Sequence, residues 1–157
     1  MLNEQKFLDG AQRALDYYKR QPDITEFKPE LGTLSHIYGY MMEGLAEMGE
    51  KELARQGLDK AFALQGRNGS IPAYPGVSWV CSTGVAQLGI AAALIGWKDE
   101  AKKALEYLET IQNESGGFYG SYGEGAKFFP NEEISWGDKF FIDLHLLVRG
   151  ENGTVES

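Results

Sequence analysis

The sequence predicts an all-α protein built from repeated helical hairpins. Three segments carry small or apolar residues at the helical spacing i, i+3, i+4, i+7, with charged residues on the opposite face. The segments are Ala11, Ala14, Leu15 and Tyr18, then Ala54, Gly57, Leu58 and Ala61, then Ala101, Ala104, Leu105 and Leu108. They recur at intervals of 43 and 47 residues, a period typical of stacked helical hairpins. We therefore expect three amphipathic outer helices.

More apolar helices lie between these segments. From Thr83 to Trp97 only Thr83 and Gln87 have polar side chains, so this helix belongs inside the protein. An equivalent helix runs from about Ser35 to Met48, and a third begins near Ser135. The expected order is outer, inner, outer, inner, outer, inner. The turns from inner to outer helices are short and contain Gly49 or Gly96, which suit helix C-termini.

The connections from outer to inner helices, residues 66–80 and 113–134, are long and rich in glycine, proline and aromatic residues. Loops of this length in a compact domain are usually functional or disordered. Both open with a similar phrase, because residues 65–71 match residues 112–118 at the 47-residue offset. The alternation of long and short connections places the long loops at one end of the assembly, beside the N-termini of the inner helices.

Composition narrows the classes of function. A net charge of −8 argues against non-specific binding to nucleic acid. The single cysteine, Cys81, excludes an intrachain disulfide and a multi-cysteine metal site. The N-terminus lacks the apolar segment of a signal peptide, and no apolar run reaches the roughly 18 residues that span a bilayer. We expect a cytoplasmic protein with one domain, residues 1–150, a polar tail, residues 151–157, no membrane partner, no metal and no cofactor.

The Gln-x-x-x-Gly-Gly-Phe turn at residues 112–118 resembles the repeat of the terpenoid cyclase and protein prenyltransferase toroids. The other matching residues are His36–Tyr40, Trp79–Gly84 with Gln87, Gly120 with Ser121, and Trp136 with Lys139–Asp143. The pattern covers about residues 31–147. It is more similar to the pattern of prenyltransferase-like toroid proteins associated with bacterial polysaccharide biosynthesis than to that of the cyclases and protein prenyltransferases themselves. The resemblance implies an α/α toroid, in which six inner and six outer helices form a closed double ring.

Three inner and three outer helices would make half of such a toroid. The unpaired first and last helices would then expose apolar stripes. Two copies of the chain could close the ring as a homodimer. Alternatively, the chain is the C-terminal half of a full toroid and pairs with a missing N-terminal half.

Two departures from the family pattern disfavour isoprenoid chemistry. The Asp-rich motif that protonates substrate in squalene and hopene cyclases is absent. The Asp, Cys and His that hold zinc in protein prenyltransferases have no convincing equivalents here. Isoprenoid handling is therefore the least favoured alternative. It predicts that the mouth of the toroid, the end where the inner helices begin and the long loops lie, leads into a deep apolar cavity.

The association with polysaccharide biosynthesis implies a carbohydrate ligand, and an acidic sugar chain fits the residues expected at the mouth. Helix N-termini favour anions, and aromatic side chains with scattered polar groups suit sugars. The predicted substrate-binding residues are Tyr40, Tyr74, Trp79, Gln87, Tyr119, Tyr122, Trp136 and Lys139. Packing of the loops onto the helix ends is the alternative role for each aromatic residue.

The predicted catalytic residues are His36, Glu132, Glu133 and Asp138. Histidine can act as acid, base or ligand at neutral pH, and paired carboxylates can act on a glycosidic bond. Each has a structural alternative, since a lone histidine is often a hydrogen-bonded structural residue and acidic residues suit the first turn of a helix. Cys81 lies near a helix N-terminus, where a thiol pKa tends to fall, but no histidine is near it in the sequence, and buried packing is the favoured interpretation.

Two hypotheses of function follow. The first is an enzyme that hydrolyses, eliminates or epimerises a glycan. The second is a non-enzymatic helical-repeat module that binds a glycan or serves as a scaffold.

Overall fold

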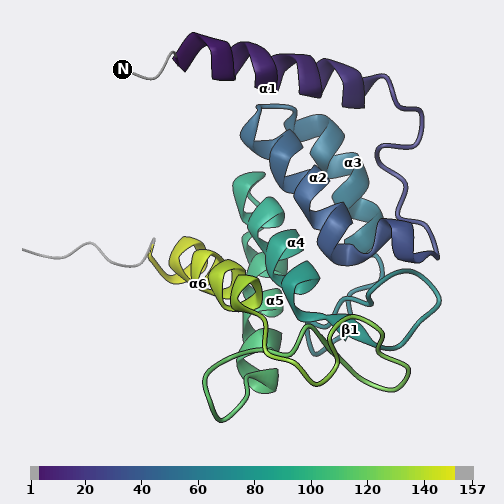
Figure 1. Cartoon of the computed structure of the whole chain (residues 1–157), viewed down its shortest axis with the longest axis vertical. Helices are drawn as coiled ribbons and strands as arrows, with labels where there is room; N and C mark the ends of the chain where they lie inside the picture. The colour runs from purple at the N-terminus through teal and green to yellow at the C-terminus, as the bar shows by residue number, and fades with distance from the viewer. Residues whose placement is uncertain (1–3, 151–157) are drawn as a thin grey trace, which may run out of the picture.

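The computed structural model describes residues 4–150, which are predominantly helical. Their six α-helices are α1 (Glu4–Lys19), α2 (Ser35–Glu47), α3 (Lys51–Phe62), α4 (Ser82–Leu94), α5 (Lys98–Ile111) and α6 (Ser135–Arg149) (Figure 1). A short 3-10 helix, η1 (Leu31–Thr33), and two short strands, β1 (Val80–Cys81) and β2 (Ser121–Tyr122), lie in the connections. The all-α class is thus confirmed, and the expected order of helices is observed. The predicted polar tail, residues 151–157, lies outside the described residues.

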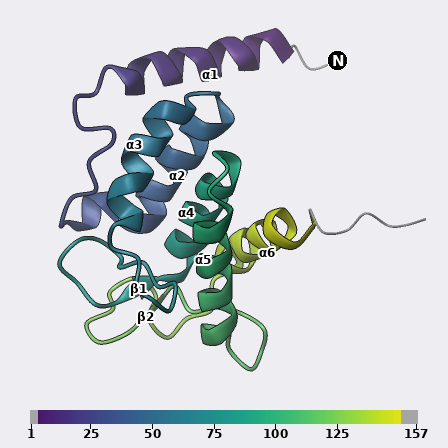
Figure 2. The same cartoon turned by 180° about the vertical axis from the view of Figure 1, so that it is seen from behind.

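Helices α2, α4 and α6 form a row with α4 in the middle. Helix α4 packs against α2 on one side and α6 on the other, while α3 and α5 pack against the row (Figures 1 and 2). Every residue from Ser82 to Ala92 is buried, as expected for a helix without a polar face. The helices approach closely, because a Cβ atom on Gly84 of α4 would overlap Oγ of Ser35 on α2. Helix α4 is therefore the centre of the core.

Helices α3 and α5 bury the amphipathic stripes that the sequence predicted. The stripe residues with no exposed surface are Ala54, Leu58, Ala61, Ala101, Ala104 and Leu105. The turns before these helices contain Gly49 and Gly96, with φ angles of 86° and 92°. Glycine adopts this left-handed conformation without the steric cost that a Cβ atom imposes.

The first and last helices bury much less of their apolar surface. Leu15 is the single buried residue of α1, whereas Phe7 and Leu8 are more than 60% exposed, at 63% and 62%. On α6, Ile142 and Leu146 are 53% and 62% exposed. The expected exposed stripes are present on both terminal helices. Among the described residues, no helix combines the length and the apolarity that crossing a bilayer requires.

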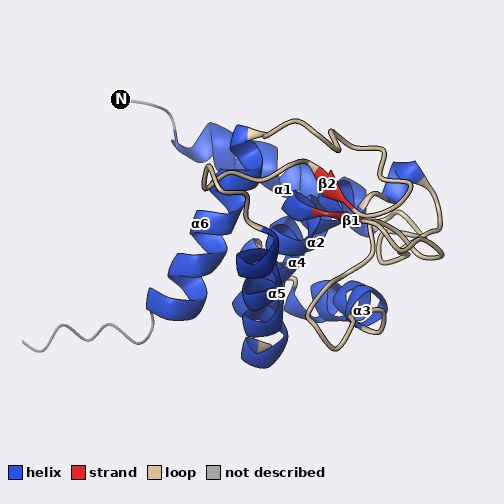
Figure 3. Ribbon diagram, turned by 90° about the horizontal axis from the view of Figure 1, so that it is seen from below, coloured by secondary structure: helices blue, strands red, loops and turns tan. Residues whose placement is uncertain are grey.

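The two long loops gather at one end of the molecule, at the N-termini of the inner helices (Figure 3). The backbone N–H of Ser35, at the start of α2, donates to the carbonyl of Ala73 in the first loop. The backbone N–H of Ser82, at the start of α4, donates to the carbonyl of Gly120 in the second loop. The placement of the loops therefore agrees with the sequence analysis.

The sequence analysis did not anticipate a small antiparallel sheet that joins the two loops. Strand β1 pairs with β2 so that Val80 lies opposite Tyr122 and Cys81 opposite Ser121. The hydroxyl of Ser82 reinforces the junction, because it donates to the carbonyl of Tyr119 at 2.6 Å. The loops thus form one connected layer over the helix ends.

Candidate functional site

Side chains of α2 and α6 meet on one side of the row of inner helices. The Phe140 ring of α6 lies 5.4 Å from the Tyr40 ring and 6.4 Å from the His36 ring of α2, measured between centroids. We call this side of the row the inner face. Its residues are His36, Tyr40 and Glu43 from α2, Gln87 from α4, and Lys139, Phe140 and Asp143 from α6.

A chain of hydrogen bonds crosses the inner face. Nδ1 of His36 lies 2.6 Å from Oε1 of Gln87, and Nε2 of Gln87 donates to Oε2 of Glu43 at 3.4 Å. Gln87 is fully buried, so its amide must find partners within the protein. Its two partners both come from α2. The one polar group in the middle of an apolar helix is therefore used to orient a histidine.

This chain sets the tautomer of the neutral His36 ring. The Oε1 atom of Gln87 only accepts, so Nδ1 of His36 carries the proton and Nε2 of the neutral ring carries the lone pair. Burial lowers the pKa of His36 below its usual 6.5, and the bond to Gln87 offsets part of this effect. The ring is thus neutral at pH 7, with one nitrogen available as a base.

Glu43 is the member of the inner face that the sequence analysis missed. Burial raises the pKa of its carboxyl, while the hydrogen bond from Gln87 and the charge of Lys139 lower it in part. A signal for it was present, because His36, Tyr40 and Glu43 follow the spacing i, i+4, i+7 and so share one face of α2. Its pairing with Gln87 was hidden, since the two residues lie 44 positions apart.

Aromatic and charged side chains surround the histidine. The rings of Tyr40 and Phe128 lie 4.9 Å and 5.7 Å from the His36 ring, and Phe128 comes from the second long loop. Lys139 forms an ion pair with Asp143 at 2.6 Å, and its Nζ atom lies 4.0 Å from the centroid of the Phe140 ring. The Tyr40 residue is 50% exposed and the Lys139 side chain 57% exposed, so a ligand can reach both.

The predicted catalytic carboxylates lie in a second polar cluster, between the second long loop and the start of α6. Glu133 accepts hydrogen bonds from Nδ2 of Asn113, at 2.8 Å, and from the hydroxyl of Ser115, and these bonds lower the pKa of Glu133. Asp138 accepts from the backbone N–H of Phe118 at 3.2 Å, and burial raises the pKa of Asp138. Glu133 therefore joins the two ends of the loop, and Asp138 holds the loop onto α6.

Two predicted substrate-binding tyrosines belong to the same cluster. The hydroxyl of Tyr122 accepts from the backbone N–H of Tyr119 at 2.8 Å and donates to Oδ1 of Asn113 at 3.1 Å. The Glu132 side chain is exposed beside them. Within residues 4–150, no hydrogen bond or ion pair joins this cluster to His36. The predicted catalytic set is thus divided between two places, and the roles of its acidic members stay predictions.

The remaining predicted aromatic contacts differ in accessibility. Tyr74 and Trp79 are 9% and 2% exposed and pack edge to face, with ring centroids 5.6 Å apart, which favours the packing role. Trp136 is 37% exposed and packs against Phe129, with centroids 5.8 Å apart. Trp136 therefore keeps a surface that a ligand could contact.

Cys81 has a different character from the one its position suggested. Burial raises the pKa of the thiol to about 12, and hydrogen bonds from the backbone of Gly84 and Thr83 reduce the effect only in part. The expectation of a lowered pKa was wrong, because desolvation outweighs the field of the helix N-terminus. Cys81 thus acts as a small buried side chain in the core.

The described residues contain no group of three or more His, Cys, Asp or Glu side chains that could hold a metal ion. Comparison of the chain with protein-family models, curated proteins and solved structures found no match. The resemblance to toroid proteins therefore stays a prediction, and the function must be argued from the inner face itself.

Proposed function

We propose that the inner face binds an acidic sugar chain and that His36 acts on it as a general base. The observation that supports this is the hydrogen-bonded chain from Glu43 through Gln87 to His36. A base whose other ring nitrogen is held by a buried partner has a fixed tautomer and a fixed orientation. We propose further that the protein is half of an α/α toroid and that it serves bacterial polysaccharide biosynthesis, as the resemblance implies.

The surroundings of the histidine suit a sugar that carries a carboxylate. The exposed ring surfaces of Tyr40 and Trp136 can pack against the apolar face of a sugar ring. The ammonium group of Lys139 can exchange its partner, Asp143, for a ligand carboxylate. The exposed pair gives up little in that exchange, since surface ion pairs contribute about 1 kcal/mol or less.

The reaction class follows from a neutral base beside a phenol. Elimination and epimerisation of a uronate sugar both begin when a base removes the proton from the carbon next to the carboxylate, and Nε2 of His36 accepts it. In elimination, the C–H electron pair forms a double bond, the C–O bond to the next sugar breaks, and the leaving oxygen takes a proton from the Tyr40 hydroxyl. In epimerisation, the Tyr40 hydroxyl gives a proton to the opposite face of the same carbon, and the proton held by His36 later returns to the phenolate through solvent.

The two reactions need two readouts. Acidic oligosaccharides incubated with the protein in deuterated water should incorporate deuterium at the carbon next to the carboxylate if they are epimerised, as observed by NMR, and should gain the ultraviolet absorbance of a new C=C bond if they are eliminated. His36→Ala should slow either reaction at least about 100-fold, which is the usual contribution of a general base. The matched control is His145→Ala, because the only other histidine faces Glu109 at 3.9 Å on another side of α6. A folded His36→Ala variant that reacts at the wild-type rate would contradict the role of His36.

A non-enzymatic binding module is the second candidate function. The observation that favours it is the structural use of Glu133 and Asp138, because these predicted catalytic carboxylates bond within the second polar cluster and not to His36. Calorimetric titration with the same oligosaccharides separates the two candidates. Binding that weakens in Lys139→Ala, with neither deuterium incorporation nor a new C=C bond, supports the module. The absence of both binding and reaction rejects the two candidates together.

A further inference from the structure

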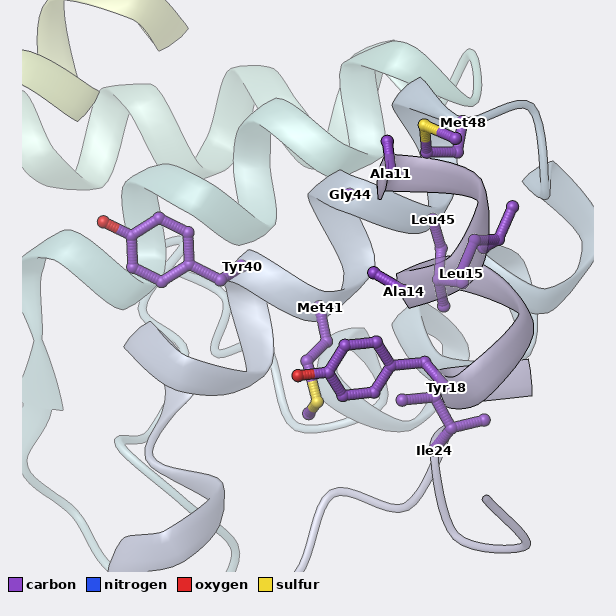
Figure 4. Close-up of a pocket in the computed structure, with 10 residues that line it drawn as sticks. All are labelled: Ala11, Ala14, Leu15, Tyr18, Ile24, Tyr40, Met41, Gly44, Leu45 and Met48. Atoms are coloured by element: carbon purple, nitrogen blue, oxygen red, sulfur yellow. The ribbon is translucent and has the colours of Figure 1, made fainter. Parts of the chain in front are cut away.

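An apolar groove of about 330 Å³ separates α1 from α2. Its walls are the stripe of α1, formed by Ala11, Ala14, Leu15 and Tyr18, and the side of α2 that carries Met41 and Leu45 (Figure 4). None of the residues that line it is charged. The groove therefore offers a partner apolar contact and close packing rather than ion pairs.

The internal repeat indicates what such a groove holds elsewhere in the molecule. The α1 wall corresponds to Ala54, Gly57, Leu58 and Ala61 of α3, and the α2 wall corresponds, 47 residues on, to Leu88 and Ala92 of α4. All six of these residues are buried. The helix that covers them is α2, since a Cβ atom on Gly57 would meet Met42 and Tyr38. The groove is thus the seat of an inner helix one repeat before α2.

That seat is open in the single chain. Tyr18, Tyr40 and Met48 line it and are 46%, 50% and 40% exposed. Their repeat equivalents are Ala61, Gln87 and Ile95, which are 0%, 0% and 8% exposed. Exposed apolar surface of this extent marks an interaction site.

The other end of the row lacks the complementary element. Helices α2, α4 and α6 begin at Ser35, Ser82 and Ser135, so their eighth residues are Met42, Gly89 and Ile142. Met42 lies against Gly57 of α3, and Gly89 lies near Ala104 of α5. Within residues 4–150, no outer helix covers Ile142, which is 53% exposed. Helix α6 is therefore an inner helix that awaits an outer one.

We propose that a second copy of this chain seats its α6 in the groove, so that α1 of one copy covers Ile142 and Leu146 of the other. Each chain carries both the groove and the α6 helix that fills it. A two-fold dimer therefore has two such groove–helix junctions, which form at the same time. In the repeat register, Ile142 lies opposite Ala14 of the partner copy, because Ala14 is the equivalent of Gly57.

The exposed area reaches the size of a specific interface. The apolar side chains that the two junctions would cover on each copy are 37–63% exposed, and they are Phe7, Leu8, Tyr18, Met48, Ile142, Leu146 and Leu147. At roughly 100 Å² each, they contribute on the order of 700 Å² per copy, above the lower bound of about 600 Å² for a specific interface.

The dimer would also extend the candidate site. Tyr40 lines the groove and contacts His36, so a helix seated in the groove stands beside the inner face. The inner face of one copy would then continue onto the α6 helix of its partner. This inference rests on the repeat and on exposure, and it holds whatever ligand the inner face takes.

Size-exclusion chromatography coupled to light scattering, over the micromolar concentration range, tests the proposal because it measures the mass of the protein in solution. The expected mass is twice that of the chain. Replacing Ile142 and Leu146 together by Asp should weaken the dimer at least about 100-fold, because it places charges in an apolar contact. The control is Leu64→Asp. Leu64 is 41% exposed and lies outside both the groove and α6, so this change should leave the dimer intact. A wild-type monomer, or a ladder of larger assemblies, would overturn the proposal.

Cross-linking tests the register with variants whose substitutions are on exposed residues. Ala14→Cys and Ile142→Cys are prepared as separate chains, mixed and oxidised, and the native Cys81 does not compete because it is buried. A disulfide-linked pair of chains should form in the mixture and in neither variant alone. No cross-link in the mixture would reject the register. A monomer that instead binds a polyisoprenol in the groove would assign the groove to a ligand and reject the dimer.

Discussion

Gly84→Ala is the substitution that most directly tests the close contact between α2 and α4. The new Cβ atom would overlap the hydroxyl of Ser35 and lie 2.7 Å from the backbone N atom of His36. A backbone atom cannot rotate away as a side chain can, so the helices must separate. Restoring van der Waals distance requires a movement of about 1 Å.

The cost and its functional consequence can be estimated. Overpacking of a core costs about 1–3 kcal/mol, and an obstructing backbone places this case near the upper value. For a chain of this size, that corresponds to a decrease in melting temperature of roughly 6–12 °C. A shift of about 1 Å would also stretch the 2.6 Å contact between His36 and Gln87 beyond hydrogen-bonding range. Because that bond raises the pKa of His36, its loss should lower the pKa further.

Thermal unfolding followed by circular dichroism measures the first effect, and NMR titration of the two histidines measures the second. His145 serves as the internal reference for the titration. The matched control is Gly44→Ala, also in a helix, where a Cβ atom would meet nothing within 4 Å. It should stabilise the protein by roughly 0.5–1 kcal/mol. A Gly84→Ala variant that melts with the wild type and leaves the His36 titration unchanged would refute the reasoning.

Three further predictions concern Glu43, Cys81 and Glu133. Because the pKa of Glu43 is raised above its ordinary 4.5, its stabilising contribution is full below that pH and is lost as the pH rises through the folded-state value. Glu43→Gln should therefore melt above the wild type at neutral pH and close to it at pH 4, and the reverse trend would contradict the burial argument. The buried Cys81 thiol should react with a thiol reagent only as fast as the protein unfolds, so rapid labelling of folded protein would show that it is accessible. Glu133→Ala should speed hydrogen exchange at the Gly117 amide, which donates to the Ser115 hydroxyl that Glu133 holds, without slowing any reaction that depends on His36. A loss of activity with an intact loop would restore a catalytic role for Glu133.

The helices were predictable because their signals are local. Each inner helix begins at a serine followed by an apolar run, and each outer stripe follows the 3.6-residue period. The 47-residue offset between Ser35 and Ser82 even gives the register of the repeat. Such patterns need only neighbours in the chain to be recognised.

The site was predictable only in part because its contacts are not local. His36 and Gln87 were recognised as polar groups on apolar helices, but the carboxylate that completes their hydrogen-bonded chain was not. Phe128 reaches His36 from a loop whose course depends on the β1–β2 pairing. The strands are only two residues long and pair across a long stretch of sequence, so they produce no periodic pattern of apolar residues from which they could be predicted.

The central position of α4 has a consequence for how the protein opens. Helices α2, α3, α5 and α6 all pack on α4, so none of the three repeats has a core of its own. A chain arranged in this way should lose α2 to α6 in a single cooperative step, unlike a linear array that unravels repeat by repeat. In a single chain, helix α1 is held mainly by Leu15 and by the ion pair between Lys19 and Glu50, so it can detach alone. Hydrogen exchange on the chain with Ile142 and Leu146 replaced by Asp, which cannot form the proposed dimer, should therefore record two stabilities, a low one for α1 and a high shared one for the rest.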